Sequence, residues 1–180
     1  GLTEAGRLLQ GEAVREGDLL VGLASDGLHT NGYSLARRAL LEKAGLRPSE
    51  KVPELGVTLS EALLEPHRNY APAVLPLLAG PASPVRAVAH ITGGGLADNL
   101  ARVIPAGLAA EIRLGAWEVP ALFRLIQRCG EVPESDPVGR GMLETFNMGI
   151  GLVLLVEPAR RGEVLQALDS AGERAVVLGR

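Results

Sequence analysis

Short aliphatic runs recur along the chain and are separated by segments with helical spacing. Runs of Leu, Val, Ile and Ala four to eight residues long predict buried strands, and an alternating pattern at 108–113 predicts one more. The predicted strands span residues 18–24, 85–90, 108–113, 149–156 and 175–178.

Between these strands, apolar residues return every three or four positions, which predicts amphipathic helices. Pro72 and Pro76 interrupt one of them, and Pro105 and Gly130 follow two others as stop signals. The predicted helices span residues 34–43, 58–64, 69–78, 96–104, 122–129 and 163–171.

Alternating strands and helices favour an α/β layer architecture. There is no internal repeat, and the two most flexible-looking stretches, 51–56 and 130–140, lack the length and composition of an interdomain linker. We therefore expect residues 1–180 to form a single domain.

Composition narrows the class of protein. The 180 residues are 47% hydrophobic but only 3% aromatic, so the core must be aliphatic. The net charge of -3 and the lack of a basic stripe argue against nucleic-acid binding, and no apolar run approaches the roughly 20 residues of a membrane helix. Cys129 is the single cysteine, which excludes an internal disulfide and fits the cytoplasm.

The first candidate site is the loop after the first predicted strand, residues 25–32, which reads SDGLHTNG. His29 can act as an acid or a base near neutral pH, and Asn31 offers both a donor and an acceptor. The same residue types also make polar turns. The residues alone leave both interpretations open.

The second candidate is the stretch HITGGGL at residues 90–96, between a predicted strand and a helix start. Three glycines allow backbone N–H groups to approach a phosphate, and the helix start and Thr92 would add to its binding. It is not a Walker sequence, because no Lys-Ser/Thr follows the glycines. A tight strand-to-helix turn is the alternative.

Other residues give weaker signals. Arg68 could bind a phosphate oxygen or simply cover the surface, and Asn147 could be a ligand group or a turn residue. Cys129 lies on an apolar helical face, which indicates a core position. No His, Cys and carboxylate spacing resembles a zinc site, so no metal site is predicted.

Taken together, these motifs resemble the C-terminal domain of the phosphoribosylformylglycinamidine cyclo-ligase (aminoimidazole ribonucleotide synthetase) family. The resemblance rests on GDLLVGL at 17–23, SDGLHTNGYSL at 25–35, HITGGGL at 90–96 and FNMGIG at 146–151, in the family's order. Asn99, Arg102 and Pro105 fit the third of these motifs. Two departures are His67, where Thr is usual, and a chain that stops at Arg180, slightly earlier than the family sequence.

The resemblance implies a fold and a reaction. The fold would be a three-layer α/β domain around a mixed sheet, partly ferredoxin-like. The reaction would be the ATP-driven closure of formylglycinamidine ribonucleotide to aminoimidazole ribonucleotide, a ligase step of purine biosynthesis. The family's N-terminal domain, absent here, would make most of the contacts with ATP and Mg²⁺ and most of the homodimer interface. The isolated chain would then be inactive.

The resemblance also implies roles for individual residues. His29 would transfer a proton or stabilise an oxyanion, Asn31 would orient the substrate, and His90 would lie near it. The glycines would hold the ribose phosphate of the phosphorylated ribonucleotide. The residues expected to bind substrate are Ser25, Asp26, Thr30, Arg68, Thr92, Gly93, Gly94 and Gly95.

Two other interpretations remain. The chain could come from a relative in the same ATP-binding superfamily: formylglycinamidine ribonucleotide synthetase, selenophosphate synthetase or thiamine-monophosphate kinase. The stretch HTNGYSL at 29–35 favours the cyclo-ligase among them. The chain could instead be a non-catalytic ligand-binding or assembly module.

Overall fold

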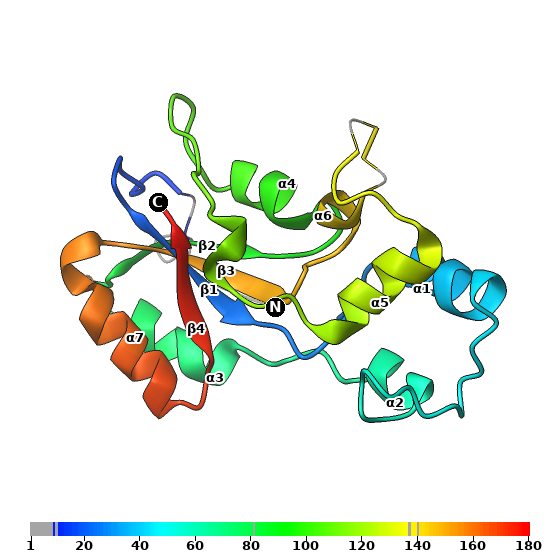
Figure 1. Cartoon of the computed structure of the whole chain (residues 1–180). Helices are drawn as coiled ribbons and strands as arrows, with labels where there is room; N and C mark the ends of the chain where they lie inside the picture. Colours follow the sequence, from blue (N-terminus) through cyan, green and yellow to red (C-terminus); the bar gives the residue numbers. More distant parts are fainter. Residues whose placement is uncertain (1–8, 10, 81, 137, 140) are drawn as a thin grey trace.

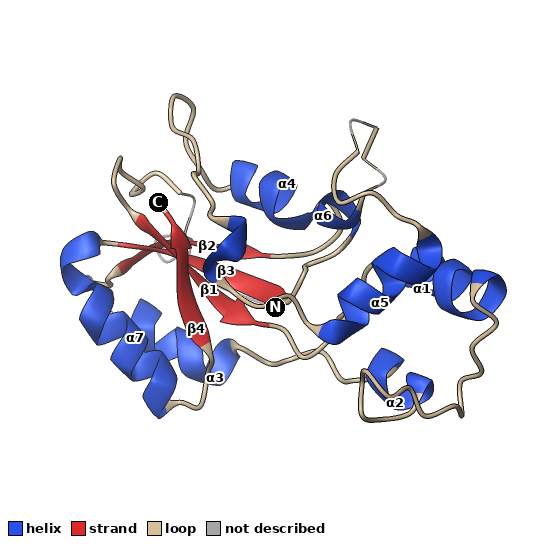
Figure 2. Ribbon diagram, in the orientation of Figure 1, coloured by secondary structure: helices blue, strands red, loops and turns tan. Residues whose placement is uncertain are grey.

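The computed structural model describes residues 9, 11–80, 82–136, 138–139 and 141–180. Within this part of the chain, four strands form one sheet in the order β2-β3-β1-β4 (Figures 1 and 2). The strands are β1 (Leu19–Ala24), β2 (Val85–His90), β3 (Ile150–Val156) and β4 (Ala175–Gly179).

The described residues also form seven α-helices, with short 3-10 and π-helical segments between them. The α-helices are α1 (Tyr33–Arg37), α2 (Leu59–Leu63), α3 (Ala71–Val74), α4 (Gly95–Ala101), α5 (Ala121–Gly130), α6 (Met142–Thr145) and α7 (Arg161–Ser170). The remaining segments are the π-helix η2 (Arg38–Lys43) and the 3-10 helices η3 (Leu75–Leu78), η4 (Leu114–Ala116) and η5 (Pro158–Arg160).

The strand order and directions are those of a ferredoxin-like unit, with α4, α5 and α6 inserted between β2 and β3. This confirms the expected α/β class and ferredoxin-like character. The expected mixed sheet needs a correction, because β1 pairs antiparallel with both β3 and β4, and β2 pairs antiparallel with β3. The crossover between β1 and β2 leaves room for β3 between them, so these two like-directed strands never pair.

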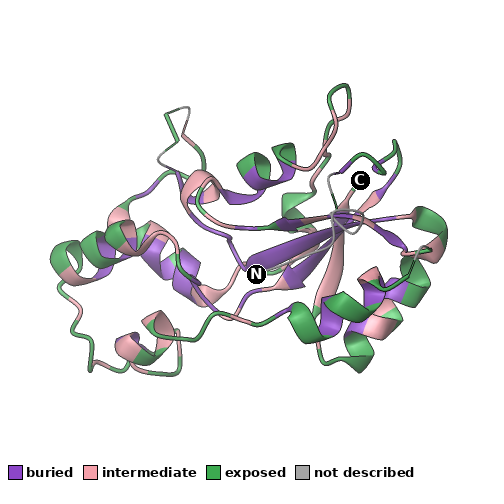
Figure 3. Ribbon diagram, turned by 180° about the vertical axis from the view of Figure 1, so that it is seen from behind, coloured by how far each residue is buried: buried purple, intermediate pink, exposed green. Residues whose placement is uncertain are grey.

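Each face of the sheet is covered by a separate apolar layer. Helices α3 and α7 pack on one face, around Leu23, Leu154 and Leu168. Helix α4 and the segment that follows it pack on the other, around Ile91 and Val153. Strand β3 is buried along its whole length (Figure 3).

A third cluster lies beyond the end of the sheet, where α1, η2, α2, α5 and α6 gather (Figure 1). Its centre is formed by Leu40, Phe123 and Phe146, whose two phenyl rings meet edge to face at 5.8 Å. Cys129 packs at the margin of this cluster, as its apolar helical position predicted.

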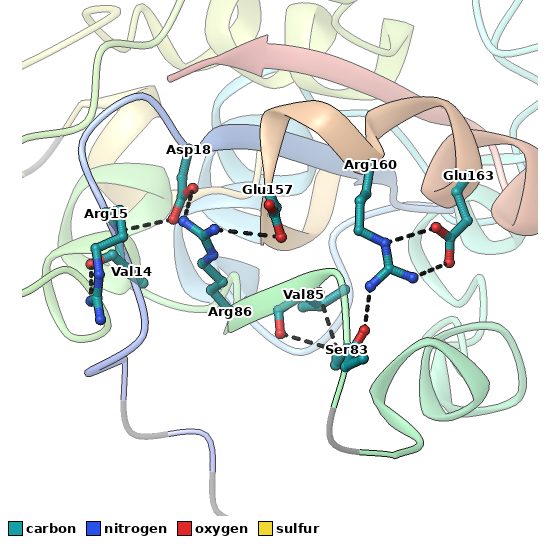
Figure 4. Close-up of polar contacts among 10 residues, drawn as sticks. Val14, Arg15, Asp18, Ser83, Val85, Arg86, Glu157, Arg160 and Glu163 are labelled. Carbon is teal, nitrogen blue, oxygen red and sulfur yellow. Dashed lines mark hydrogen bonds and ion pairs between the residues drawn. The ribbon is translucent and has the colours of Figure 1, made fainter.

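An ion-pair bridge ties together the strand ends opposite the candidate site. Arg86 of β2 donates to the buried carboxylate of Asp18, at 2.7 Å, and lies 3.5 Å from Glu157 just after β3 (Figure 4). The second Asp18 oxygen accepts from the Arg15 backbone N–H at 2.8 Å. The carboxylate of Asp18 can be buried because it has two donors.

The structure modifies three predicted elements. The helix predicted over 69–78 becomes 3-10 helical at Leu75, because Pro76 has no N–H to donate and its ring crowds the preceding turn. Residues 34–43 form α1 followed by the wider η2. The helix predicted over 96–104 ends as α4 at Ala101.

The strand predicted over 108–113 is wrong as a full strand. Only Ile112 forms a bridge, with Gly179 beside β4. The alternation that predicted it arises because Leu108, Ala110 and Ile112 pack under the sheet.

No helix in the described part of the chain is both long and apolar enough to cross a membrane.

Candidate functional site

All three histidines of the chain meet at one place. His29 lies in the loop after β1, His67 in the segment before α3, and His90 is the last residue of β2. The rings of His29 and His67 stack with centroids 3.9 Å apart, and the Nε2 atoms of His67 and His90 lie 3.1 Å apart. Residues 23 to 61 positions apart in sequence thus form one imidazole cluster.

His29 has a backbone conformation and a depth of burial that are unusual for a polar residue. Its backbone has a φ of 56°, in the left-handed region, and its side chain is only 3% exposed. Neither ring nitrogen has a hydrogen-bond partner among the residues that the structure describes. Burial, helped by the neighbouring His67 and opposed by Asp26, lowers the pKa of His29 to about 4. At neutral pH the His29 imidazole is therefore uncharged.

His90 and His67 lie at the surface, so the cluster is open to solvent on one side. Burial of its ring and the nearby His67 lower the pKa of His90. Behind the cluster, Tyr70 faces the edge of the His29 ring and donates to the carbonyl of Ala24 at 2.8 Å. The cluster thus has a buried side and an exposed side.

Gly151 provides the room for these rings. A Cβ atom there would overlap the Tyr70 hydroxyl and the His29 ring. Gly151 lies within the central strand β3, so only glycine allows the aromatic groups to lie directly against the sheet.

Beside the cluster, Arg68 forms ion pairs with two carboxylates. Its guanidinium makes a bidentate pair with Asp26, at 2.6 and 2.8 Å, and donates to Glu173 at 3.0 Å. These partners raise the pKa of Arg68 above its usual value. Sequence reasoning placed Arg68 and Asp26 on the substrate. In the structure they bind each other and fix the His29 loop to the segment before β4.

A buried amide joins the SDGLHTNGYSL and FNMGIG motifs. The Oδ1 of Asn147 accepts from the Ser25 hydroxyl at 3.0 Å and from the Gly149 N–H at 2.8 Å. Its Nδ2 donates to the carbonyl of Gly27 at 2.9 Å. The sequence predicted that Ser25 binds substrate; in the structure its hydroxyl donates to Asn147.

The glycine loop lies next to the His29 loop, with the Asn31 amide oxygen 3.7 Å from where a Gly93 side chain would begin. Thr30 is exposed on the same His29 loop. Thr92 donates to Asn99, whose amide in turn donates to the carbonyl of Gly95 at 2.7 Å. The two candidate loops therefore do converge.

Two of the three glycine N–H groups that were expected to approach a phosphate already donate to backbone carbonyls. Gly94 donates to the carbonyl of Glu144 at 2.9 Å, and Gly95 donates to the carbonyl of Thr92 at 3.1 Å. Both glycines have positive φ, at 95° and 63°. Their conformation is thus required by a tight turn against α6, and binding of a phosphate by this loop remains a prediction centred on Gly93.

Comparison with known proteins places these loops in a family. Residues 15–180 match the family described as AIR synthase related protein, C-terminal domain. The chain belongs to this family.

Curated relatives in the AIR synthase family share its sequence over nearly the whole chain. The phosphoribosylformylglycinamidine cyclo-ligase of Sorangium cellulosum is 47% identical over 99% of this chain and 50% of its own length. The cyclo-ligase of Thermoanaerobacter pseudethanolicus is 41% identical over 99% of this chain and 51% of its own length. The chain thus spans about half the length of these relatives.

A solved structure shows that the fold extends beyond close relatives. The thiamine-monophosphate kinase from Stenotrophomonas maltophilia K279a aligns with a TM-score of 0.63 over 99% of this chain and 51% of its own. At 17% identity, this likeness concerns the fold alone.

Sequence reasoning about this AIR synthase-related chain missed His67 as a site residue and did not predict the imidazole cluster. The zinc-type spacing rules look for ligands close together in sequence, whereas these three come from separate loops. One signal was available: His29 and His67 lie in connections between predicted elements, and His90 is the last residue of a predicted strand. Among the described residues, His29, His67 and His90 form the one group able to hold a metal ion.

Proposed function

We propose that this chain forms the C-terminal half of a phosphoribosylformylglycinamidine cyclo-ligase, which closes the imidazole ring of aminoimidazole ribonucleotide with ATP. The observation that carries the proposal is the convergence of the three motif loops. The His29 loop contacts the FNMGIG segment through Asn147, and Asn31 adjoins Gly93 of the glycine loop. The cyclo-ligase names of relatives at 41–47% identity support it.

In this proposal His29 acts as an uncharged imidazole. A group with a pKa of about 4 carries no proton to donate as an imidazolium at neutral pH. A neutral ring can still donate one N–H to a developing oxyanion, and low solvation strengthens that hydrogen bond. Of the two roles that the resemblance implied, oxyanion stabilisation therefore fits His29 better than acid catalysis.

The exposed residues around His29 would bind and orient the substrate. His90 and Asn31 border the open side of the cluster, and Gly93 offers the glycine-loop position where an added side chain would meet only ordinary contacts. The ribose phosphate would lie against Gly93 and Thr92. Arg68 would act indirectly, by holding Asp26 and thereby the His29 loop.

The described residues do not suit Mg²⁺-ATP. Magnesium prefers carboxylate and phosphate oxygens, whereas the group here that could hold a metal consists of three imidazoles. Asp26, the carboxylate nearest the cluster, is already paired with Arg68. We therefore assign ATP, Mg²⁺ and the homodimer contacts to the N-terminal half found in the relatives, and we expect the isolated chain to be inactive.

The test is turnover by the intact gene product. Purified protein supplied with formylglycinamidine ribonucleotide and ATP should form aminoimidazole ribonucleotide and ADP in equal amounts. Thiamine monophosphate, formylglycinamide ribonucleotide with glutamine, and selenide serve as substrates for the superfamily alternatives. Turnover of any of these with none of formylglycinamidine ribonucleotide would overturn the proposal, as would full activity without an N-terminal half.

A further inference from the structure

We propose that His29, His67 and His90 together bind one divalent transition-metal ion, of which Zn²⁺ is the prototype and Co²⁺ or Cu²⁺ the spectroscopic substitutes. The proposal rests on the positions of three side chains and does not require the cyclo-ligase activity.

The ligand atoms are already close to the geometry of a metal site. One ring nitrogen from each histidine lies within 4.8 Å of the other two, and the Nε2 atoms of His67 and His90 are 3.1 Å apart. Zinc–nitrogen bonds of 2.0–2.1 Å in a tetrahedral site place two ligand nitrogens about 3.3 Å apart. An ion between His67 and His90 needs little change in the separation of their Nε2 atoms. The His29 ring is stacked on His67, so it must tilt out of that stack as well as close by on the order of an ångström to direct a nitrogen at the same ion.

The third ligand supplies an independent indication. Both nitrogens of His29 are buried and lack any hydrogen-bond partner in the described structure. A buried polar group in that condition costs folding free energy and calls for an explanation. An ion coordinated by one of these nitrogens would provide the missing partner.

The surroundings favour imidazole ligation and leave a way in. Asp26 and Arg68 are the charged groups, other than the histidines, that act on His29 within the described part of the chain, and they are paired with each other. The Asp26 carboxylate is therefore already occupied and does not compete for the ion. His67 and His90 are exposed, which lets an ion enter from solvent. Three neutral nitrogens leave a fourth position for water, the arrangement of an open zinc site.

His67 offers a matched variant. His67→Thr removes one exposed ligand and leaves a smaller polar side chain in its place. His90→Gln removes a second exposed ligand without disturbing the buried side. Neither change touches Arg68 or Asp26 directly.

The experiment titrates the metal-free intact gene product with Co²⁺ and then displaces Co²⁺ with Zn²⁺. We expect one Co²⁺ per chain with the visible absorption of a low-coordinate nitrogen site, and Cu²⁺ should show nitrogen hyperfine splitting in its spin-resonance spectrum. His67→Thr and His90→Gln should each weaken Zn²⁺ binding by at least about 100-fold, while melting temperatures stay near wild type.

Unchanged Zn²⁺ affinity in both variants would overturn the proposal, as would octahedral, oxygen-type Co²⁺ spectra in the wild type. If one variant fails to fold, the other decides. The outcome is separable from the proposed function, because metal binding is read by spectroscopy and calorimetry. A protein that binds Zn²⁺ but fails to cyclise the substrate refutes only the cyclo-ligase assignment.

Discussion

Ser25 and Asn147, 122 positions apart in the chain, share a buried hydrogen bond of 3.0 Å. The Asn147 amide accepts two hydrogen bonds at its oxygen and donates one from its nitrogen to the Gly27 carbonyl. An amide can do both at once, whereas a carboxylate only accepts. This one side chain therefore fixes both ends of the 25–27 turn that leads to His29.

Asn147→Asp should destabilise the protein although it changes a single atom. The new carboxylate oxygen would face the Gly27 carbonyl oxygen in a buried position, at a cost of about 2–3 kcal/mol in the free energy of unfolding. Urea denaturation measures this cost. Ser25→Ala, which removes one neutral hydrogen bond, should cost only about 1 kcal/mol. Equal stability of Asn147→Asp and wild type would contradict the role given to the amide.

His29→Asn should damage activity more than stability. Asn is among the residues that tolerate the positive φ found at position 29, and the imidazole it replaces makes no hydrogen bond to any described residue. We expect turnover of formylglycinamidine ribonucleotide by the intact enzyme to fall about 10²-fold or more, with a melting temperature equal to or above that of the wild type. A large loss of stability with full specific activity would indicate a purely structural residue.

Arg68→Ala should destabilise the fold by leaving Asp26 and Glu173 without their shared cation. The Glu173 side chain is only 8% exposed, so its charge would be poorly solvated. The expected loss in the free energy of unfolding is about 1–3 kcal/mol. Arg128→Ala removes a solvent-exposed pair with Glu54 and should cost less than about 1 kcal/mol. Similar losses in the two variants would show that the Arg68 network has no special weight.

The glycine loop can be dissected by two alanine substitutions. Gly95→Ala should cost more than about 2 kcal/mol, because φ is positive and the new Cβ would overlap the Leu143 carbonyl. Gly93→Ala meets only an ordinary contact with Asn31, so the fold should remain intact. If the loop holds the substrate phosphate, Gly93→Ala raises the KM for the ribonucleotide and leaves the KM for ATP unchanged. An unaltered ribonucleotide KM would remove Gly93 from the site.

Stability of chelator-treated protein should rise with pH between about 4 and 6.5. The folded protein holds His29 with a pKa of about 4, whereas the unfolded chain titrates it near 6.5, so the unfolded state binds more protons in this window. The contribution is complete above pH 6.5 and is lost as the pH falls towards 4. Its size is on the order of 2–3 kcal/mol. His29→Asn should flatten this part of the stability curve, measured by urea denaturation at each pH; an unchanged slope would argue against a buried neutral imidazole.

Most elements of the sheet could be predicted because their sequences carry short-range signals. The runs LLVGLA and IGLVLLV are short and apolar throughout, which is typical of buried strands, and they form β1 and β3 in the structure. The relative direction of paired strands was harder to predict from the sequence, since antiparallel and mixed sheets bury the same residues. The alternation at Leu108 and Ala110 predicted a strand for a related reason: one buried face gives the same pattern with or without a partner strand.

The site was predictable in its loops and not in its contacts. Motif order pointed to His29 and His90, whereas the commitment of Arg68 to Asp26 and of Asn147 to Ser25 depends on folding distant segments together. His67 became visible as a neighbour of both other histidines only in three dimensions. Local sequence carries no information on that proximity.

Gly151 contributes no side chain, yet the ring atoms of His29 and Tyr70 occupy the volume that a side chain would take. Because β3 is buried along its length, a harmful substitution at position 151 would ordinarily be attributed to a general loss of core packing. Substitutions at Gly151 are expected to be harmful for a different reason. The neighbouring apolar side chains of β3 fill the space on the sheet surface, whereas Gly151 leaves that space to the rings of His29 and Tyr70. Variation at position 151 is therefore best interpreted together with residues 29 and 70, as a change in the shape of the site.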